Sequence, residues 1–187
     1  MENNMKKTFK SLSIIIAIVA AMAFALTACG ESEEATGTGE AGMPNPWSTA
    51  ESLDEAAKGA GLDGFEIPEG AEISLGKVEV TEYRYMDTIA EARIEFPAVE
   101  MTIRKGTKEY ESAEGDISGD YGEYKYNWTT NIKGLEVKCS GNREGEATRT
   151  IWNVDDIDYS ITAFGLGGDD DYGLPEDDLK TLISGIQ

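Results

Sequence analysis

The sequence predicts an α+β domain: a twisted antiparallel sheet of about six strands, with an N-terminal and a C-terminal helix packed on one face. Three observations predict this fold. Apolar residues recur at helical spacing within 53–60 and again within 179–186. Between these segments, apolar and polar residues alternate in several short runs. Turn residues separate the runs closely, which favours a meander with one face in water.

The first helix is expected to begin near Ser48. Ser48 and Glu51 have the spacing of a capping box, in which each side chain accepts a hydrogen bond from the other residue's backbone N–H. One helical face is apolar and consists of Leu53, Ala56, Ala57 and Ala60. Gly59 and Gly61 mark the end of the helix. Residues 65–70 then read as an extended stretch that ends in a turn.

The strands are predicted from alternation with a period of two residues. The alternating runs cover 78–80, 90–96, 99–103, 124–128, 135–139, 148–152 and 157–161. Pro97 lies where the alternation changes phase, so it indicates a bend or a strand boundary. Lys133-Gly134 and residues 153–156 provide turns between neighbouring runs.

The closing helix is predicted from its acidic start and its apolar stripe. Pro175 suits the first turn, and Glu176, Asp177 and Asp178 suit the positive end of the helix dipole. The apolar stripe consists of Leu179, Leu182, Ile183 and Ile186.

The N-terminus has the three parts of a secretory signal. Three lysines make it basic: Lys6, Lys7 and Lys10. An apolar run follows over 12–26, and small residues precede Cys29. The tetrapeptide Leu26-Thr27-Ala28-Cys29 is similar to the lipobox of bacterial lipoproteins. The alternative is an uncleaved transmembrane helix, which needs about 20 apolar residues. Polar residues follow Cys29 at once with no basic stop-transfer cluster, which favours the lipoprotein.

The resemblance to lipoproteins implies a lipid anchor and a location at the cell membrane. Residues 1–28 would be a signal peptide, removed whether translation begins at Met1 or Met5. Cys29 would carry a covalent diacylglycerol that holds the protein on the extracytoplasmic face of the cell membrane, since each buried methylene contributes about 0.8 kcal/mol. Residues 29–45 are rich in Glu, Gly, Ala and Thr, so we expect a flexible acidic tether. Residues 46–187 suit a single domain.

The domain also resembles a known group of sequences. The similar segments are 45–47, 101–106, 115–121, 151–152, 158–161 and 175–186. They resemble an uncharacterised domain family of Gram-positive lipoproteins and anti-sigma-like membrane proteins. The resemblance implies an extracytoplasmic α+β domain, and it implies no particular reaction.

Charge and residue types exclude several classes of function. The chain has 16 Lys+Arg and 36 Asp+Glu, and the part after residue 28 keeps 13 and 35, a net charge of −22. This charge excludes nucleic acid as a partner and favours cations or basic partners. There is no histidine, the usual general base and metal ligand. We expect a monomer.

Cys139 is the first candidate for chemistry. It falls on the apolar phase of its strand run, and with Cys29 lipidated it has no partner for a disulfide. A nucleophilic cysteine needs a nearby base or positive charge that lowers its pKa. We therefore expect a buried, unreactive core residue, and we predict no catalytic residue.

Acidic and aromatic residues provide the other candidates. Asp169, Asp170 and Asp171 are a weak calcium candidate within the acidic run 155–178, because calcium prefers several carboxylate oxygens. The spacing does not match an EF-hand loop, and a solvated acidic loop explains the run more simply. No cofactor other than the lipid is expected. An aromatic set could stack on a sugar or belong to the core: Tyr124, Tyr126 and Trp128.

These observations favour a non-enzymatic binding or sensing module at the cell envelope, whose ligand is an unknown envelope component or surface protein. The alternative is a hydrolase that acts on cell-wall or exogenous polysaccharide through paired carboxylates. With 36 acidic residues in the chain, no particular pair stands out in the sequence. A cleft with two facing carboxylates would distinguish the alternative.

Overall fold

The computed structural model describes residues 45–107, 116–167 and 171–187. The predicted signal peptide and nearly all of the predicted tether lie outside these ranges. The chain divides into two units, and only the second, Asn45–Gln187, is described. It begins one residue before the predicted domain boundary. No helix within the described ranges is long and apolar enough to cross a membrane.

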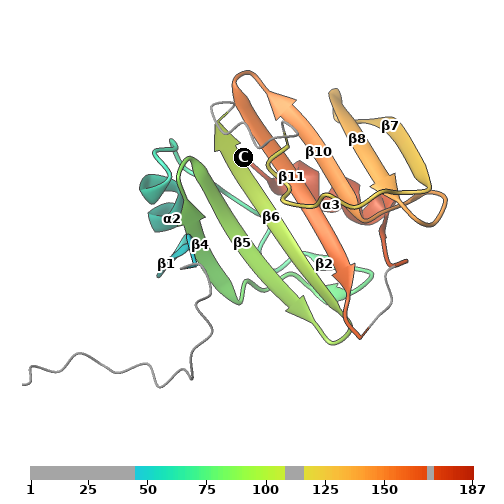
Figure 1. The fold of residues 1–187 in the computed structure, drawn as a ribbon, viewed down its shortest axis with the longest axis horizontal. Helices are drawn as coiled ribbons and strands as arrows, with labels where there is room; N and C mark the ends of the chain where they lie inside the picture. Colours follow the sequence, from blue (N-terminus) through green and yellow to red (C-terminus); the bar gives the residue numbers. More distant parts are fainter. Residues whose placement is uncertain (1–44, 108–115, 168–170) are drawn as a thin grey trace, which may run out of the picture. The chain divides into compact units, whose positions relative to one another are not determined.

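The main sheet has eight antiparallel strands, not about six. In spatial order they are β1 (Ser48–Ala50), β4 (Glu82–Met86), β5 (Ile89–Phe96), β6 (Val99–Thr107), β11 (Ile157–Gly165), β10 (Arg149–Val154), β8 (Leu135–Gly141) and β7 (Tyr126–Ile132). Six of them correspond to predicted runs, whereas the seventh run, 78–80, is not a strand. The two additional strands, β1 and β4, lie together at one edge of the sheet (Figure 1).

Two short ribbons and two helices complete the described fold. The ribbons pair β2 (Glu72–Ile73) with β3 (Gly76–Lys77), and β9 (Glu146–Ala147) with β12 (Leu174–Pro175). The helices are α2 (Leu53–Gly59) and α3 (Glu176–Gly185). The predicted α+β class, an antiparallel sheet with two helices, is therefore observed, although β1 of the main sheet precedes α2 in the chain.

Helix α2 begins later than its predicted capping box. Ser48 lies in β1 and pairs with Tyr85, so it cannot cap a helix. The N-cap is Ser52, whose Oγ accepts a hydrogen bond from the Glu55 backbone N–H at 3.2 Å. The Glu55 carboxylate in turn accepts from the backbone N–H of Glu51 at 2.8 Å. The pairing of β1 with β4 therefore overrides the Ser48 pattern and moves the start of the helix.

The predicted turns are confirmed. Gly61 follows α2 with a φ of 72°. Lys133 and Gly134 have φ values of 51° and 88° and join β7 to β8, as a two-residue hairpin turn requires. Pro97 lies between β5 and β6. Asp155 and Asp156 join β10 to β11.

The apolar core lies on one face of the sheet, on the side of α3, which Figure 1 shows behind the strands. The inward side chains belong to the predicted apolar phases, as in the row that joins Ala92, Ile103 and Ile161 through the strand register. From α3, the buried apolar side chains are Leu179, Leu182 and Ile183. Pro175 is the N-cap of α3 and does not lie in the first turn. Asp178 is buried and accepts a hydrogen bond from Ser74 N at 3.0 Å, which ties α3 to the β2–β3 ribbon.

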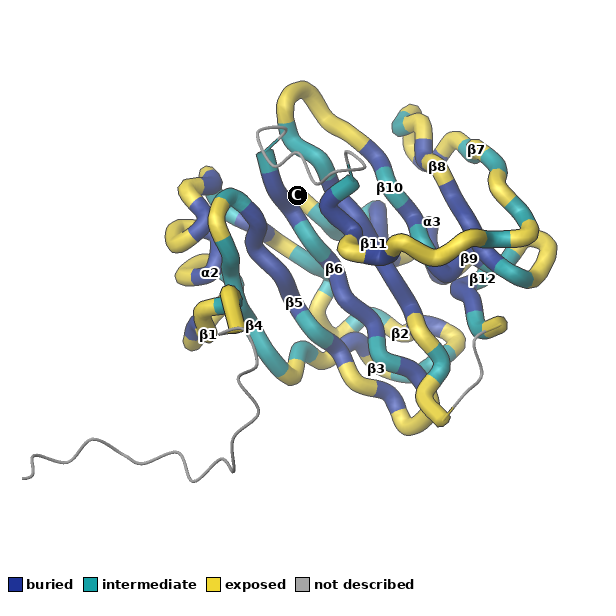
Figure 2. Tube along the Cα trace, in the orientation of Figure 1, coloured by how far each residue is buried: buried dark blue, intermediate teal, exposed yellow. Residues whose placement is uncertain are grey.

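The alternation predicts that the second face of the sheet is exposed to water. In the structure this face is partly covered. Buried positions follow one another along β5, β6 and β11 (Figure 2). Glu91 points to this face and has no exposed surface. Its Oε1 accepts from Arg84 Nε and its Oε2 from Arg104 Nε, both at 2.6 Å. The ring of Trp47 lies 4.6 Å from the Arg84 guanidinium and 5.1 Å from that of Arg104. The Glu91 carboxylate is therefore paired with two arginines beneath the Trp47 ring, and it is not solvated by water.

Residues 116–124, which we call the crossing segment, run over this second face. Figure 1 shows them in front of β11 and β10, whereas α3 lies behind. Arg104 donates to the Ile117 carbonyl at 2.8 Å, and Arg149 donates to the Asp120 carbonyl at 2.7 Å. Gly119 has a φ of 67°, and a Cβ there would collide with Arg104 Nη1. A side chain at this position would therefore be strained and would have to displace the Arg104 guanidinium that holds the segment.

We predict that Glu91→Gln lowers the free energy of unfolding by about 3–5 kcal/mol, because it leaves two arginines without their shared buried carboxylate. Urea unfolding of the variant and of the wild-type chain measures this change. Glu79→Gln is the matched control. Glu79 pairs with Lys77 at 3.0 Å where both side chains are exposed, so its loss should cost less than about 1 kcal/mol. Equal effects of the two variants would contradict the structural role given to Glu91.

Candidate ligand-binding pocket

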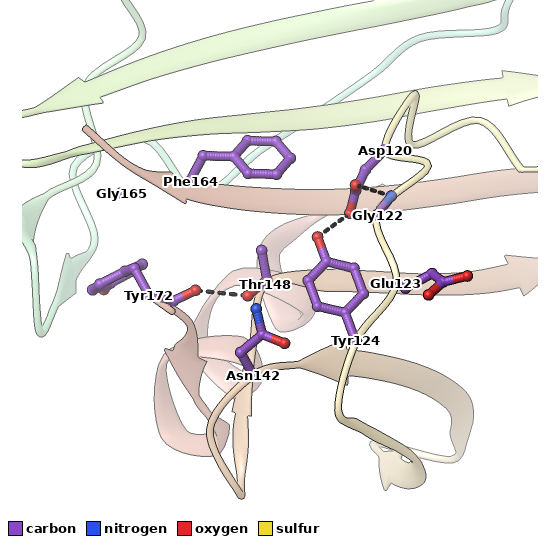
Figure 3. Close-up of a pocket in the computed structure, with 9 residues that line it drawn as sticks. All are labelled: Asp120, Gly122, Glu123, Tyr124, Asn142, Thr148, Phe164, Gly165 and Tyr172. Atoms are coloured by element: carbon purple, nitrogen blue, oxygen red, sulfur yellow. Dashed lines mark hydrogen bonds between the residues drawn. The ribbon is translucent and has the colours of Figure 1, made fainter. Parts of the chain in front are cut away.

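A hollow of about 230 Å³ lies on the second face, between the crossing segment and the end of β11 (Figure 3). It is lined by Asp120, Gly122, Glu123, Tyr124, Asn142, Thr148, Phe164, Gly165 and Tyr172. These residues come from five separate stretches of the chain. We call this hollow the Tyr124 pocket.

The wall formed by the crossing segment is fixed by Asp120. This residue is buried, and its carboxylate accepts hydrogen bonds from the Gly122 backbone N–H at 2.9 Å and from the Tyr124 hydroxyl. The Arg149 guanidinium, which holds the Asp120 carbonyl, also lies 5.4 Å from the centre of the Tyr124 ring. One arginine of the sheet therefore positions both the acid and the ring.

The opposite wall combines polar and apolar groups. Thr148 Oγ1 donates to the Tyr172 carbonyl at 2.6 Å, and Asn142 Oδ1 accepts from the Lys125 backbone N–H at 3.3 Å. In Figure 3 the Phe164 ring lies above Thr148, and the Tyr172 ring points away from Tyr124. Two aromatic rings, those of Tyr124 and Phe164, thus lie on two sides of the polar groups.

Exposed apolar side chains occur in this pocket and next to its lining residues in the sequence. Only four large apolar side chains of the described ranges are exposed. Phe164, at 40%, lines the pocket, while Tyr121 and Leu166, at 59% and 50%, each adjoin a lining residue in sequence. The fourth, Val154, lies in β10 outside the lining set. Apolar groups left in water beside a hollow with a few fixed polar groups are typical of a binding site.

The electrostatics of the pocket favour hydrogen bonding over acid–base chemistry. Burial, and then the hydrogen bond to the Asp120 carboxylate, raise the pKa of Tyr124 well above its usual value near 10. The hydroxyl therefore stays protonated and acts as a donor to Asp120. The second carboxylate, that of Glu123, points away from the Tyr124 ring and from the other lining side chains in Figure 3. The two carboxylates of this pocket do not face each other.

Two further hollows lie elsewhere on the domain. One of about 300 Å³ is lined by Asp116, Ile117, Glu136, Lys138, Ile151, Trp152, Asn153 and Asp158. One of about 410 Å³ is lined by Lys125, Tyr126, Asn127, Trp128, Glu144 and Gly145. The structure therefore divides the aromatic set that the sequence placed together. Tyr124 lines one hollow, whereas Tyr126 and Trp128 line another.

Most of the site residues predicted from the sequence fall outside the described ranges. These are Cys29, Asp169 and Asp170. Asp171 is described and exposed. Within the described ranges, no group of three or more Cys, Asp or Glu side chains could hold a metal ion. The calcium candidate therefore stays untested.

Cys139 is buried, as its phase in the strand predicted. Burial is the main cause that raises the pKa of its thiol from 9.0 to about 11. A thiol with this pKa is almost fully protonated at neutral pH and is a poor nucleophile.

Sequence reasoning missed the residues that shape the Tyr124 pocket, apart from Tyr124 itself. Asp120 and Asn142 lie outside the predicted strands, so no periodicity marked them. One signal was available for Phe164. It is a large aromatic residue on the outward phase of β11, directly after the inward Ala163.

Comparisons of this chain with protein-family models, with curated proteins and with solved structures give no match. The pocket is therefore interpreted from its own geometry.

We predict that the buried thiol of Cys139 makes stability fall between about pH 9 and pH 11. The pKa is higher in the fold than in the unfolded chain, so the fold favours the neutral thiol. This contribution is fully present below pH 9 and is lost as the pH rises through 11, by about 2 kcal/mol at pH 11. Urea unfolding of the wild-type chain and of Cys139→Ala at each pH gives the two free energies of unfolding. Their difference isolates the ionisation of the thiol from that of the tyrosines, which both chains share. A difference between the two chains that does not change with pH would contradict it.

Proposed function

We propose that this protein is a lipid-anchored module displayed outside the cytoplasmic membrane, and that its Tyr124 pocket binds a saccharide unit of an envelope polymer without turning it over. The observation that carries the proposal is the pocket itself. It combines two aromatic rings, one of them exposed, with a fixed acid and an amide.

The chemistry of the lining fits a sugar ring. The faces of Tyr124 and Phe164 can cover the apolar C–H face of such a ring. Asp120 has acceptor capacity beyond its two bonds, and Asn142 has an amide that both donates and accepts. The hollow of about 230 Å³ is smaller than typical pockets for drug-sized ligands, which begin near about 300 Å³. It therefore suits one unit at a time.

Charge narrows the class of saccharide. The lining includes two carboxylates and no basic side chain. The chain as a whole has a net charge of −20. An anionic polymer would be repelled by both. We therefore infer a neutral or amino sugar.

Recognition is favoured over hydrolysis in this pocket by the direction of its acids. A glycosidase places two carboxylates on either side of the scissile bond, about 5–9.5 Å apart. Here Glu123 points away, and Asp120 is already held by Gly122 and Tyr124. The hydrolase alternative therefore has no acid pair at this site, and an assay for turnover tests it directly.

The proposal of a lipid anchor is supported by the sequence. Leu26-Thr27-Ala28-Cys29 ends the apolar run, and the described domain begins at Asn45. Residues 29–44 would then separate the lipid from the fold. A pocket of this kind would be presented to polymer outside the membrane.

We predict that Cys29→Ala abolishes labelling of the protein by a clickable fatty acid in growing cells, because the thiol that carries the lipid is lost. Cys139→Ala is the matched control, since it removes the only other cysteine and should leave labelling intact. Labelled Cys29→Ala protein would refute the anchor.

We predict that Phe164→Ala weakens binding to insoluble peptidoglycan and to soluble N-acetylglucosamine oligomers about tenfold, the loss of one stacking surface. Co-sedimentation and calorimetric titration measure the affinity. Val154→Ala is the control, because Val154 is equally exposed, at 39%, and lies outside the pocket lining. Equal binding by both variants would contradict the pocket assignment. If the wild-type chain released shorter oligomers from these substrates and the Asp120→Asn variant did not, the hydrolase alternative would be favoured.

A further inference from the structure

Strand β7 forms one edge of the main sheet, and its outer side has no strand beside it in the described ranges. It is seven residues long, whereas β1 at the opposite edge has three. Beyond its ladder with β8, the described structure shows no backbone hydrogen bond from Tyr126–Ile132. An edge of this length is a template for another strand.

The hairpin turn determines which backbone groups point outward. In the two-residue turn, Ile132 and Leu135 flank Lys133-Gly134 and form a hydrogen-bonded pair. Hydrogen-bonded and non-hydrogen-bonded pairs alternate along an antiparallel ladder. The N–H and C=O groups of three residues therefore point away from β8, and these residues have exposed side chains: Asn127, Thr129 and Asn131.

The strand also lacks the usual protection of an edge. It contains no charged residue and no proline in a chain in which 28% of residues are charged. Natural edges are commonly blunted by inward charges, prolines or bulges. Here the charges lie at the two ends, where Lys125 directly precedes the strand and Lys133 directly follows it. Both lysines are exposed.

We propose that β7 is a strand-addition site for an extended segment of another protein, uncharged over the length of β7 and carrying a carboxylate at each end. Backbone bonds to Asn127, Thr129 and Asn131 would hold the segment, and Lys125 and Lys133 would set its register. The proposal concerns a surface separate from the Tyr124 pocket and does not depend on saccharide binding.

Charge argues against a second copy of this chain as the occupant. Antiparallel pairing of two β7 strands about Thr129 would place Lys125 of one copy against Lys133 of the other. It would also join two strongly acidic domains. A different protein that is not itself strongly acidic avoids both penalties.

The hollow of about 410 Å³ next to the edge supplies a place for a side chain of the added strand. Tyr126 and Trp128 line it with apolar surface, and Lys125 Nζ lies 4.9 Å from the Tyr126 ring. In strand addition, backbone bonds supply affinity and such hollows supply specificity. An apolar side chain on the added strand fits this hollow.

The test uses the full chain in detergent and a short fluorescent peptide with glutamate at both ends, opposite Lys125 and Lys133, and alternating threonine and valine between them. Fluorescence anisotropy should show saturable binding. A twin peptide with lysine at both ends should bind about tenfold more weakly or less. No saturable binding, or equal affinity for the two peptides, would overturn the proposal.

Variants at Thr129 separate strand addition from other modes of binding. Thr129→Pro removes an outward N–H and no bond of the β7–β8 ladder, so the fold should persist while the affinity falls about tenfold or more. Thr129→Val keeps the N–H and should bind as the wild-type chain does. A Glu-ended peptide with its alternate amides methylated repeats the test without altering the protein. Binding that survives both changes would show that the peptide does not add as a strand.

Discussion

The organisation of the second face depends on one ion cluster, the Glu91 carboxylate between Arg84 and Arg104. A charge with no exposed surface is tolerable only when it is paired and hydrogen-bonded, so this carboxylate requires both arginines in place. The arginines in turn need cover, which Trp47 supplies from the start of the domain and Ile117 from the crossing segment. A buried acid in β5 therefore determines where two distant pieces of chain lie on the sheet.

The same arrangement changes the electrostatic character of the surface. Four of the five arginines of this chain point to the second face, where they pair with acids or hold backbone carbonyls: Arg84, Arg93, Arg104 and Arg149. Because these cations are partly buried within the network, less positive charge is left to face the solvent. The outer surface is therefore dominated by carboxylates. A ligand that reaches the Tyr124 pocket meets acceptor groups and aromatic rings, which is why the proposal excludes anionic polymers.

Local patterns predicted much of the fold, and their failures share a physical cause. Alternation found six strands because their inward side chains enter one apolar core. It missed β4, in which Tyr83 and Tyr85 alternate with Arg84 and Met86, and all four are only half-buried. The alternation also predicted that Glu91 is exposed to water, because a period of two identifies the face of a side chain but not what covers that face. The Tyr124 pocket could not be predicted, since Asp120, Asn142 and Phe164 come together only through contacts between distant segments.

The path of the chain explains why the two proposed binding surfaces are neighbours and yet separable. The chain leaves β6 in the middle of the sheet and enters β7 at its edge, and the crossing segment is the described part of that connection. Arg104 and Arg149 hold this segment against the strands, so the wall of the Tyr124 pocket depends on the second face. Strand β7 depends instead on its full ladder with β8 and on the Lys133-Gly134 turn. Loosening the arginine contacts should therefore disturb the pocket and leave the β7 edge in place.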